Sequence, residues 1–184
     1  MKKMTKKLLW APWRMGYING GKEEGCLFCR KGAGKDDLAD HVVARGERCF
    51  VLLNLFPYNS GHLMVAPYRH TGKLEDLEPE ESAELMDLVR ESVRVLKGRL
   101  APEGFNVGFN LGKSAGAGIV DHLHLHIVPR WSGDTNFMPV ISDTRVVPQA
   151  LEDTARIIRE AFPRTGRKPE GNKATEGQPF TKES

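Results

Sequence analysis

Long uncharged hydrophobic runs are missing from this sequence of 184 residues. The longest apolar stretches, such as Cys49–Leu53 and Leu63–Ala66, are far shorter than the roughly 20 residues that a membrane-spanning helix needs. Leu8–Pro12 follows a basic start but is too short for the core of a signal peptide, and no small-residue cleavage site comes after it. We therefore expect no membrane partner and a cytoplasmic location.

Cysteine is scarce, with three residues in the chain, which favours a metal-binding or redox pair over a disulfide framework. Two of them form the motif Cys26-Leu27-Phe28-Cys29, which in a reducing compartment is typical of a metal-binding or redox pair. The third, Cys49, lies in an apolar stretch and is expected in the core.

A large excess of positive charge is also absent, since the formal net charge is +3. Residues 1–22 hold six Lys and Arg and no acid, and residues 164–184 hold five basic and three acidic residues, so residues 23–163 carry five more acids than bases. A body of that sign does not favour nucleic acid as a partner. We expect a solvated basic segment over 1–22, one domain over 23–163, and a disordered polar tail over 164–184.

Alternation and helical spacing predict an α+β fold with a mostly antiparallel sheet. Pro79 opens a long helix with an apolar stripe at spacings of three and four residues. The other expected elements are a hairpin over 41–55, strands over 61–67 and 105–110, and a late helix over 151–162.

Three of the six histidines fall within the segment His122-Leu123-His124-Leu125-His126. Alternation with a period of two predicts a strand that carries the three imidazoles on one face, with successive rings about 6.5–7 Å apart. Packing gives no reason to align three polar rings, since their nitrogens need partners. A neutral imidazole can instead attack a phosphorus centre and form a labile phosphoramidate.

A glycine-rich segment, residues 112–118, precedes the histidines. Its small residues let backbone N–H groups approach an anion closely. Three residues separate Gly108 from Gly112 where a P-loop has four, so that motif is excluded. An anion cradle remains, with a plain connecting turn as the alternative, and the cradle beside the histidines favours chemistry at phosphate.

The segment His122–Val128 resembles the signature of the histidine triad superfamily, and Asn59–Pro67 and Asn106–Asn110 are similar to two further strand motifs of that family. The flanks Leu9–Ile18 and Pro129–Phe137 resemble its prokaryotic diadenosine-tetraphosphate (Ap4A) phosphorylase, or ATP adenylyltransferase, branch. The resemblance covers about residues 8–162. It implies a sheet of about five strands with a long central and a C-terminal helix, continued across a homodimer.

The resemblance also implies nucleotidyl transfer from an adenine dinucleoside polyphosphate, with inorganic phosphate as a second small-molecule partner and no organic cofactor. His124 would be the nucleophile and His126 would contact the phosphate. The other residues that the resemblance places at the nucleotide are Asn54, Phe56, His62, Asn110, Ser114, Gly116 and Gly118. Many members of the family carry a Gln where this chain has Ala117-Gly118, which favours phosphorolysis over hydrolysis.

Zinc is the expected cofactor of the Cys26–Cys29 pair. The resemblance completes a tetrahedral, structural site with His70 and with His122, the first histidine of the catalytic segment; His41 is the spare ligand. Two reduced cysteines packed near Phe28 are the alternative.

Three other functions compete with a phosphorylase. The first is a nucleotide hydrolase of the same family. The second is a metallohydrolase, but three histidines on one strand span about 13 Å and cannot converge on a single ion. The third is a nucleotide-binding module without turnover.

Overall fold

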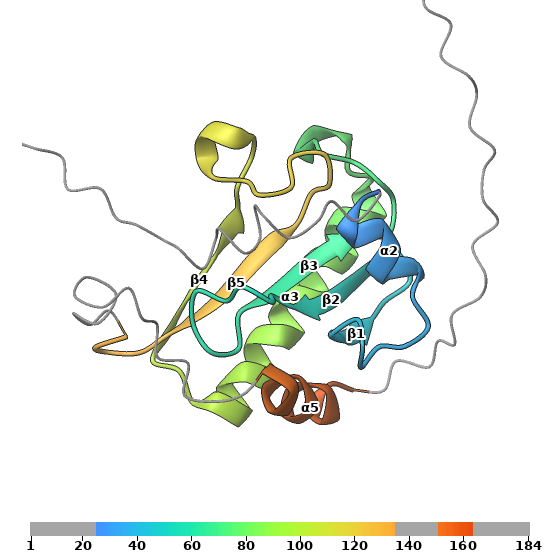
Figure 1. Ribbon diagram of the computed structural model, residues 1–184. Helices are drawn as coiled ribbons and strands as arrows, with labels where there is room; N and C mark the ends of the chain where they lie inside the picture. Colours follow the sequence, from blue (N-terminus) through green and yellow to red (C-terminus); the bar gives the residue numbers. More distant parts are fainter. Residues whose placement is uncertain (1–24, 135–150, 164–184) are drawn as a thin grey trace, which may run out of the picture.

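The computed structural model describes residues 25–134 and 151–163. Its centre is a five-stranded antiparallel sheet in the order β1-β2-β3-β5-β4 (Figure 1). The strands are β1 (Val42–Arg45), β2 (Cys49–Leu53), β3 (Leu63–Pro67), β4 (Gly104–Phe109) and β5 (Leu125–Arg130). The α+β class, the hairpin and the strand count agree with expectation. None of the described helices is long and apolar enough to cross a membrane.

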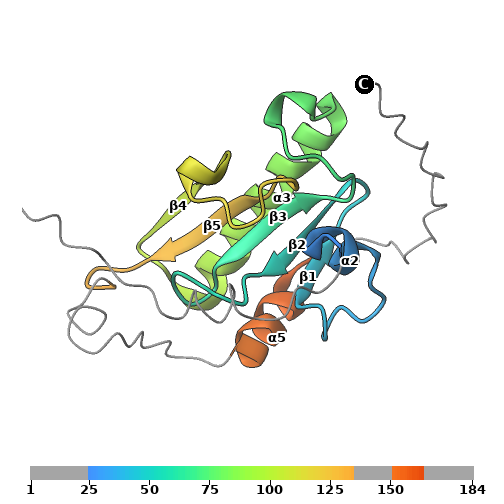
Figure 2. The ribbon, with the colours of Figure 1, turned by 45° about the horizontal axis from the view of Figure 1, so that its top comes forward.

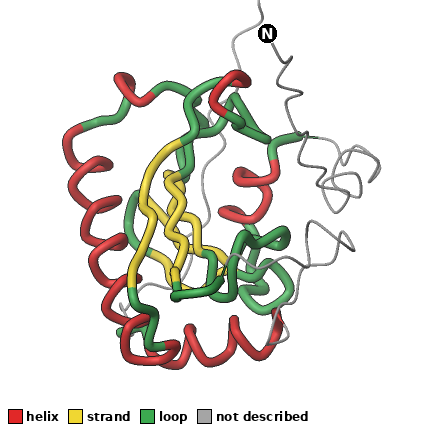
Figure 3. Tube along the Cα trace, turned by 90° about the vertical axis from the view of Figure 1, so that its left-hand side faces the viewer, coloured by secondary structure: helices red, strands yellow, loops and turns green. Residues whose placement is uncertain are grey.

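Helices cover both faces of the sheet. Figure 3 views the sheet nearly edge-on, with α3 (Pro79–Leu100) on one side and α2 (Leu27–Ala33) on the other. α5 (Leu151–Ala161) packs against α3 and β1. The short 3-10 turns η1 (Leu74–Asp76) and η2 (Lys113–Ala115) complete the fold. The expected basic and polar tails, and the motif Leu9–Ile18, lie outside the described residues.

Alternation along the strands produces two apolar cores. Val51, Val65 and Ile127 belong to the core under α3 and α5. Leu52 and Met64, which alternate with them, belong to the smaller core under α2. By the same alternation, the residues of β5 on either side of Ile127 lie on the face of the sheet that α2 covers.

α3 begins where the sequence predicts, and its start is doubly capped. Pro79 occupies the first turn, and the side chains and backbone N–H groups of Glu78 and Glu81 form a reciprocal capping box. Arg69 donates two hydrogen bonds to the buried Glu81 carboxylate at 2.9 and 2.6 Å, which lowers the pKa of that carboxyl. The connection from β3 to α3 is thereby fixed.

The histidine strand begins later than expected, at Leu125 instead of His122. The Leu123 N–H donates to the Thr71 carbonyl at 2.6 Å, so the chain is paired with the loop after β3 before it joins the sheet. His122 and His124 thus lie on an extended lead-in, and only His126 lies on the strand. A single regular row of three histidines was the wrong expectation.

Candidate active site and metal cluster

A cleft on the α2 face of the sheet holds two of the three histidines. Its walls come from α2, the end of β2, the loop before β5 and the start of β5. The lining residues are Leu27, Phe28, Lys31, Leu52, Leu53, Asn54, Leu55, Phe56, Tyr58, Met64, Asn110, Gly116, Gly118, Ile119, His124 and His126. The lining combines apolar side chains with imidazole, amide and glycine backbone. Such a combination suits a nucleoside joined to a phosphate.

The tautomer of His124 is fixed by the backbone carbonyl of His122. Its Nδ1 lies 2.8 Å from the carbonyl oxygen of His122, so Nδ1–H donates and Nε2 keeps its lone pair. Burial lowers the pKa of His124, although the hydrogen bond to the carbonyl opposes this. The ring is therefore neutral near pH 7, which is the form a nucleophile requires.

His126 is oriented by a chain of hydrogen bonds that starts behind the strand. The backbone N–H of Tyr58 donates to Nδ1 of His62 at 3.1 Å, and the Asn54 amide lies 3.4 Å from the same nitrogen. The neutral His62 ring therefore carries its proton on Nε2 and donates to Nδ1 of His126 at 3.0 Å. Nε2 of His126 then carries the proton, so its 3.5 Å contact with the side-chain nitrogen of Asn110 brings two donors together without a hydrogen bond between them. A hydrogen-bond donor thus lies next to the ring of His124.

The rings of His124 and His126 are closer together than a flat strand predicts. Their centroids are 4.9 Å apart and the rings meet edge to face, because His124 precedes the regular strand. Burial, followed by repulsion from His124, lowers the pKa of His126 to about 4. A lone pair and a donor can therefore act on one phosphoryl group at the same time.

Most of the predicted nucleotide-binding residues line the cleft. Asn54, Phe56, Asn110, Gly116 and Gly118 are among its walls. His62 is completely buried and lies behind His126, as a supporting residue would.

Ser114 is the exception, because its side chain is exposed on the turn η2 and does not line the cleft. The sequence reading missed Phe28, Lys31, Tyr58, Met64 and Ile119, which line it. Helical spacing on α2 could have paired Phe28 with Lys31, but no local signal marks the others.

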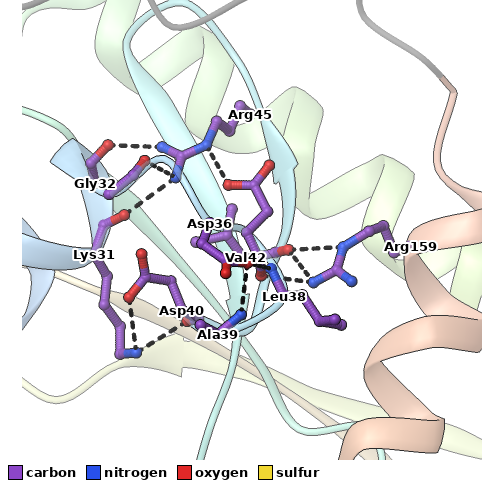
Figure 4. Close-up of polar contacts among 11 residues, drawn as sticks. Lys31, Gly32, Asp36, Leu38, Ala39, Asp40, Val42, Arg45 and Arg159 are labelled. Carbon is purple, nitrogen blue, oxygen red and sulfur yellow. Dashed lines mark hydrogen bonds and ion pairs between the residues drawn. The ribbon is translucent and has the colours of Figure 1, made fainter.

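A polar network holds α2 in place over the sheet. Arg45 donates to the carbonyls of Lys31, Gly32 and Gly34 at the end of α2, at distances of 2.6–3.2 Å. Lys31 donates to the Asp40 carbonyl at 3.0 Å, and Arg159 of α5 donates to the carbonyls of residues 37 and 42 (Figure 4). Figure 2 shows α2 over the β1 and β2 side of the sheet. The wall of the cleft is therefore fixed.

The four predicted metal ligands come together at the other end of the histidine segment. Ligand atoms of Cys26, Cys29, His70 and His122 all lie within 4.8 Å of one another. Nδ1 of His122 is 3.2 Å from Cys26 Sγ, 3.5 Å from Cys29 Sγ and 3.3 Å from His70 Nδ1. The edges of a zinc tetrahedron are roughly 3.3–3.8 Å for such ligands. His41, the spare candidate, is not part of the cluster.

The second nitrogen of His122 prepares the first for a metal. Nε2 lies 2.9 Å from the Pro67 carbonyl, so Nε2–H donates there and Nδ1 faces the cysteines with a lone pair. Burial lowers the pKa of His122 to about 4 and, with help from Cys26, raises the pKa of the Cys29 thiol to about 11. A dication would reverse the effect on the thiol by favouring thiolate.

Comparison with known proteins places these features in context. The model of the HIT domain matches residues 35–133. The AP-4-A phosphorylase of Mycobacterium tuberculosis is 45% identical over 165 residues, which cover 85% of this chain and 84% of the relative. Adenosine 5'-monophosphoramidase of Schizosaccharomyces pombe is 31% identical over 57% of this chain and 74% of its own length. The crystal structure of a zinc-bound histidine triad family protein from Mycobacterium smegmatis matches with a TM-score of 0.57 and 27% identity, over 74% of this chain and 92% of that one.

Proposed function

Because this chain belongs to the histidine triad (HIT domain) family, we propose that it is a nucleotidyltransferase that cleaves Ap4A with inorganic phosphate. The 45% identity to a protein named AP-4-A phosphorylase supports this substrate. The observation that carries the proposal is the neutral His124, whose Nδ1 is occupied by the His122 carbonyl while Nε2 keeps its lone pair beside the His126 donor.

The first chemical step forms a covalent intermediate. The lone pair on His124 Nε2 attacks the α-phosphorus, an N–P bond forms, and the P–O bond to the rest of the polyphosphate breaks. ATP departs as an anion that needs no proton. The imidazole becomes a cation, which the His122 carbonyl stabilises through Nδ1–H. His126 Nε2–H and the Asn110 amide donate to the phosphoryl oxygens.

The second step returns the enzyme to its starting state. An oxygen of inorganic phosphate attacks the same phosphorus, the N–P bond breaks, and its electron pair returns to Nε2. The product is ADP, so Ap4A and phosphate give ADP and ATP. If water took the place of phosphate, the products would be AMP and ATP. The similarity to a phosphoramidase is the observation that keeps this hydrolase alternative open.

A product analysis tests the proposal. The protein is incubated with Ap4A, with and without phosphate, and the nucleotides are resolved by chromatography. We expect ADP and ATP, formed in a phosphate-dependent way. AMP and ATP at a rate that phosphate does not change would establish the hydrolase instead, and no product from Ap4A under either condition would overturn both assignments.

We also propose that Cys26, Cys29, His70 and His122 bind one structural zinc ion. The short distances between their ligand atoms and the hydrogen bond from His122 to Pro67 support it, as does the similarity to a zinc-bound relative. A closed set of four protein ligands leaves no open position for substrate. Metal analysis by emission spectroscopy should find about one zinc per chain, and its absence from protein purified without chelator would refute the site.

A homodimer that extends the sheet through β4 is the third proposal. β4 lies at one edge of the sheet, with Val107 and the neighbouring Leu111 each nearly half exposed. An exposed edge strand with apolar side chains favours pairing with a second copy. Sedimentation should give twice the chain mass, and Val107→Lys should shift it toward the monomer. A monomeric wild-type protein would contradict this arrangement.

A further inference from the structure

Lys31 is a buried lysine in the wall of the cleft, and the proposed reaction does not use it. The residue is 7% exposed, and it lines the cleft together with Phe28, which lies three residues earlier on α2. Lysine is almost never buried unless its charge is paired, because an ammonium group loses its hydration on burial. Its presence in a ligand cleft therefore needs an explanation beyond packing.

Asp40 pairs with Lys31 inside the fold (Figure 4). Lys31 Nζ donates to the Asp40 carbonyl at 3.0 Å and lies 3.5 Å from Oδ1 of the same residue. An ammonium group carries three N–H bonds, so these two contacts leave one N–H for a ligand. The carboxylate also balances the charge of Lys31, which makes the site less attractive to a polyanion.

The place of Lys31 along α2 matches the base of a bound nucleotide rather than its phosphate. Phe28 stacks on His124, with ring centroids 4.6 Å apart. Lys31 follows one helical turn later, about 4.5 Å further along the helix axis. Leu52 and Met64, which also line the cleft, belong with Phe28 to the apolar core under α2. When a phosphate lies at His124, the ribose separates it from the base, so the base lies against these apolar walls and Lys31.

The side chains of the lining offer donors more readily than acceptors. No Asp or Glu is among the lining residues in the described part of the chain. The side-chain oxygen of Asn54 already accepts from the Phe56 N–H at 2.9 Å. Lys31 itself can only donate. The cleft therefore favours a base with acceptor atoms on the edge that meets Lys31.

Membership of the family does not decide which base this wall selects. The HIT domain match covers residues 35–133, whereas α2 ends at Ala33. The wall that holds Lys31 thus lies outside the part of the chain that defines the family.

We propose that Lys31 binds the acceptor edge of a purine and makes guanine the preferred base of the transferred nucleotide. The inference rests on the proposed function and deepens it, because it concerns the nucleoside whose α-phosphate reacts with His124. Guanine presents two adjacent acceptors, N7 and O6, to a lysine, whereas adenine has an amino donor in place of O6. Adenine keeps N7, so Ap4A remains a substrate, but a dinucleotide with guanine in the cleft is favoured over it.

A mixed dinucleotide tests the assignment by internal competition. Ap4G, in which four phosphates join adenosine to guanosine, can bind with either nucleoside in the cleft. With phosphate as acceptor, guanylyl transfer gives GDP and ATP, whereas adenylyl transfer gives ADP and GTP. The ratio of the two product pairs, resolved by chromatography, reports the base in the cleft. It does not depend on how much of the protein is folded, so a merely structural role of Lys31 would not change it.

The expected ratio favours guanine through Lys31. Wild type should give about ten times more GDP and ATP than ADP and GTP, since one good contact between lysine and a base is worth roughly tenfold. Lys31→Met keeps a side chain of similar size without the N–H donors and should bring the ratio to within about twofold of one. Lys35→Met removes an exposed lysine outside the lining and should keep the wild-type ratio. A dinucleotide with inosine in place of guanosine should behave like Ap4G, because inosine keeps N7 and O6.

Other outcomes overturn the assignment. Equal product pairs in the wild type would show that the cleft does not distinguish the two bases, and an unchanged ratio in Lys31→Met would show that another group does so. If Lys31→Met does not fold, Lys31→Gln replaces it, and its ratio should shift toward ADP and GTP because a Gln amide pairs with N6 and N7 of adenine. No products from Ap4G or Ap4A, with or without phosphate, would refute the proposed function itself, which is a different result from products in an unshifted ratio.

Discussion

His122 and His124 are two residues apart, yet they belong to two sites of opposite character. His122 points Nδ1 at two cysteines, and its Nε2–H is held by the Pro67 carbonyl. In His124 the roles are exchanged, because Nδ1–H is held by the His122 carbonyl and Nε2 is left with a lone pair. Each ring has one nitrogen fixed by a backbone carbonyl, so the carbonyl decides which nitrogen is available for chemistry.

The two sites also differ in whether their side chains face one another or face open space. The four side chains of the Cys/His cluster face one another, while in the cleft Nε2 of His124 and Nε2–H of His126 face the space that a substrate would fill, with the Asn110 side chain 3.5 Å from the latter. A closed set of ligands suits a structural role, and an open pair suits substrate. The two kinds of site should therefore respond differently to substitution, one in stability and the other in turnover.

Removal of the nucleophile should give the largest effect. His124→Ala deletes the Nε2 atom that we propose accepts the nucleotidyl group, so we expect turnover of Ap4A to fall by roughly 10³-fold or more. The melting temperature and nucleotide binding by calorimetry should change little, and no radiolabelled nucleotidyl protein should form. Wild-type turnover in this variant would show that the two histidines do not divide the roles as described.

Loss of the metal cluster should come next, and in stability. Cys26→Ser removes one sulfur ligand. Free zinc at a concentration a thousandfold above its dissociation constant would stabilise the fold by about 4 kcal/mol, which the variant would lose. We expect zinc content to fall sharply and the melting temperature to drop by roughly 8–16 °C. Cys49→Ser, at a buried cysteine outside the cluster, is the control for zinc content. A variant with full zinc content would remove Cys26 from the ligand set.

The features of the cleft and of the Cys/His cluster that depend on local sequence pattern could be predicted from the sequence. Alternation assigned Leu125 and Ile127 to the core and His126 to the opposite face, and the CxxC spacing indicated a metal pair. The start of the strand could not be predicted, because it depends on the bond from Leu123 to Thr71, 52 residues earlier in the chain.

The same distinction between local pattern and long-range contacts applies to the residues that complete each site. The geometry favours His70 over His41 because β3 ends beside the cluster, and the place of β3 in the sheet is a tertiary property. Ser114 was expected at the phosphate from the resemblance to the family, but neither the resemblance nor the local glycines show which way the turn η2 presents its side chains. Local sequence therefore predicts faces and pairs, and long-range contacts decide which pairs meet.

Acid should lower the stability of the fold through protonation of His126. The folded-state pKa is lowered from 6.5 to about 4, so the unfolded chain binds more protons between these values and stability falls as pH drops through that window. We expect a loss on the order of 2 kcal/mol from this ring. The groups around it are His62, His124, Tyr58 and the Asn110 amide.

Urea unfolding at several pH values checks this, in wild type and in His126→Gln. Burial also lowers the pKa values of His122 and His124, but both histidines are present in both proteins, so the difference between the two curves isolates His126. The variant should lose less stability between pH 7 and pH 4 than the wild type. Parallel curves would mean that burial of this ring does not couple to folding.

The smallest effect should come from Phe28, whose side chain contacts both sites. Phe28 is buried, with ring centroids 5.1 Å from His122 and 4.6 Å from His124. Phe28→Leu keeps an apolar side chain but loses the stacking, which is worth about 1 kcal/mol. If the sites are independent, the melting temperature should fall by a few degrees while zinc content and nucleotidylation rate stay within about twofold. A joint loss of zinc and of nucleotidylation, larger than that fall in stability, would instead show that the ring couples the two histidines, and that closure of the metal site sets the position of the nucleophile.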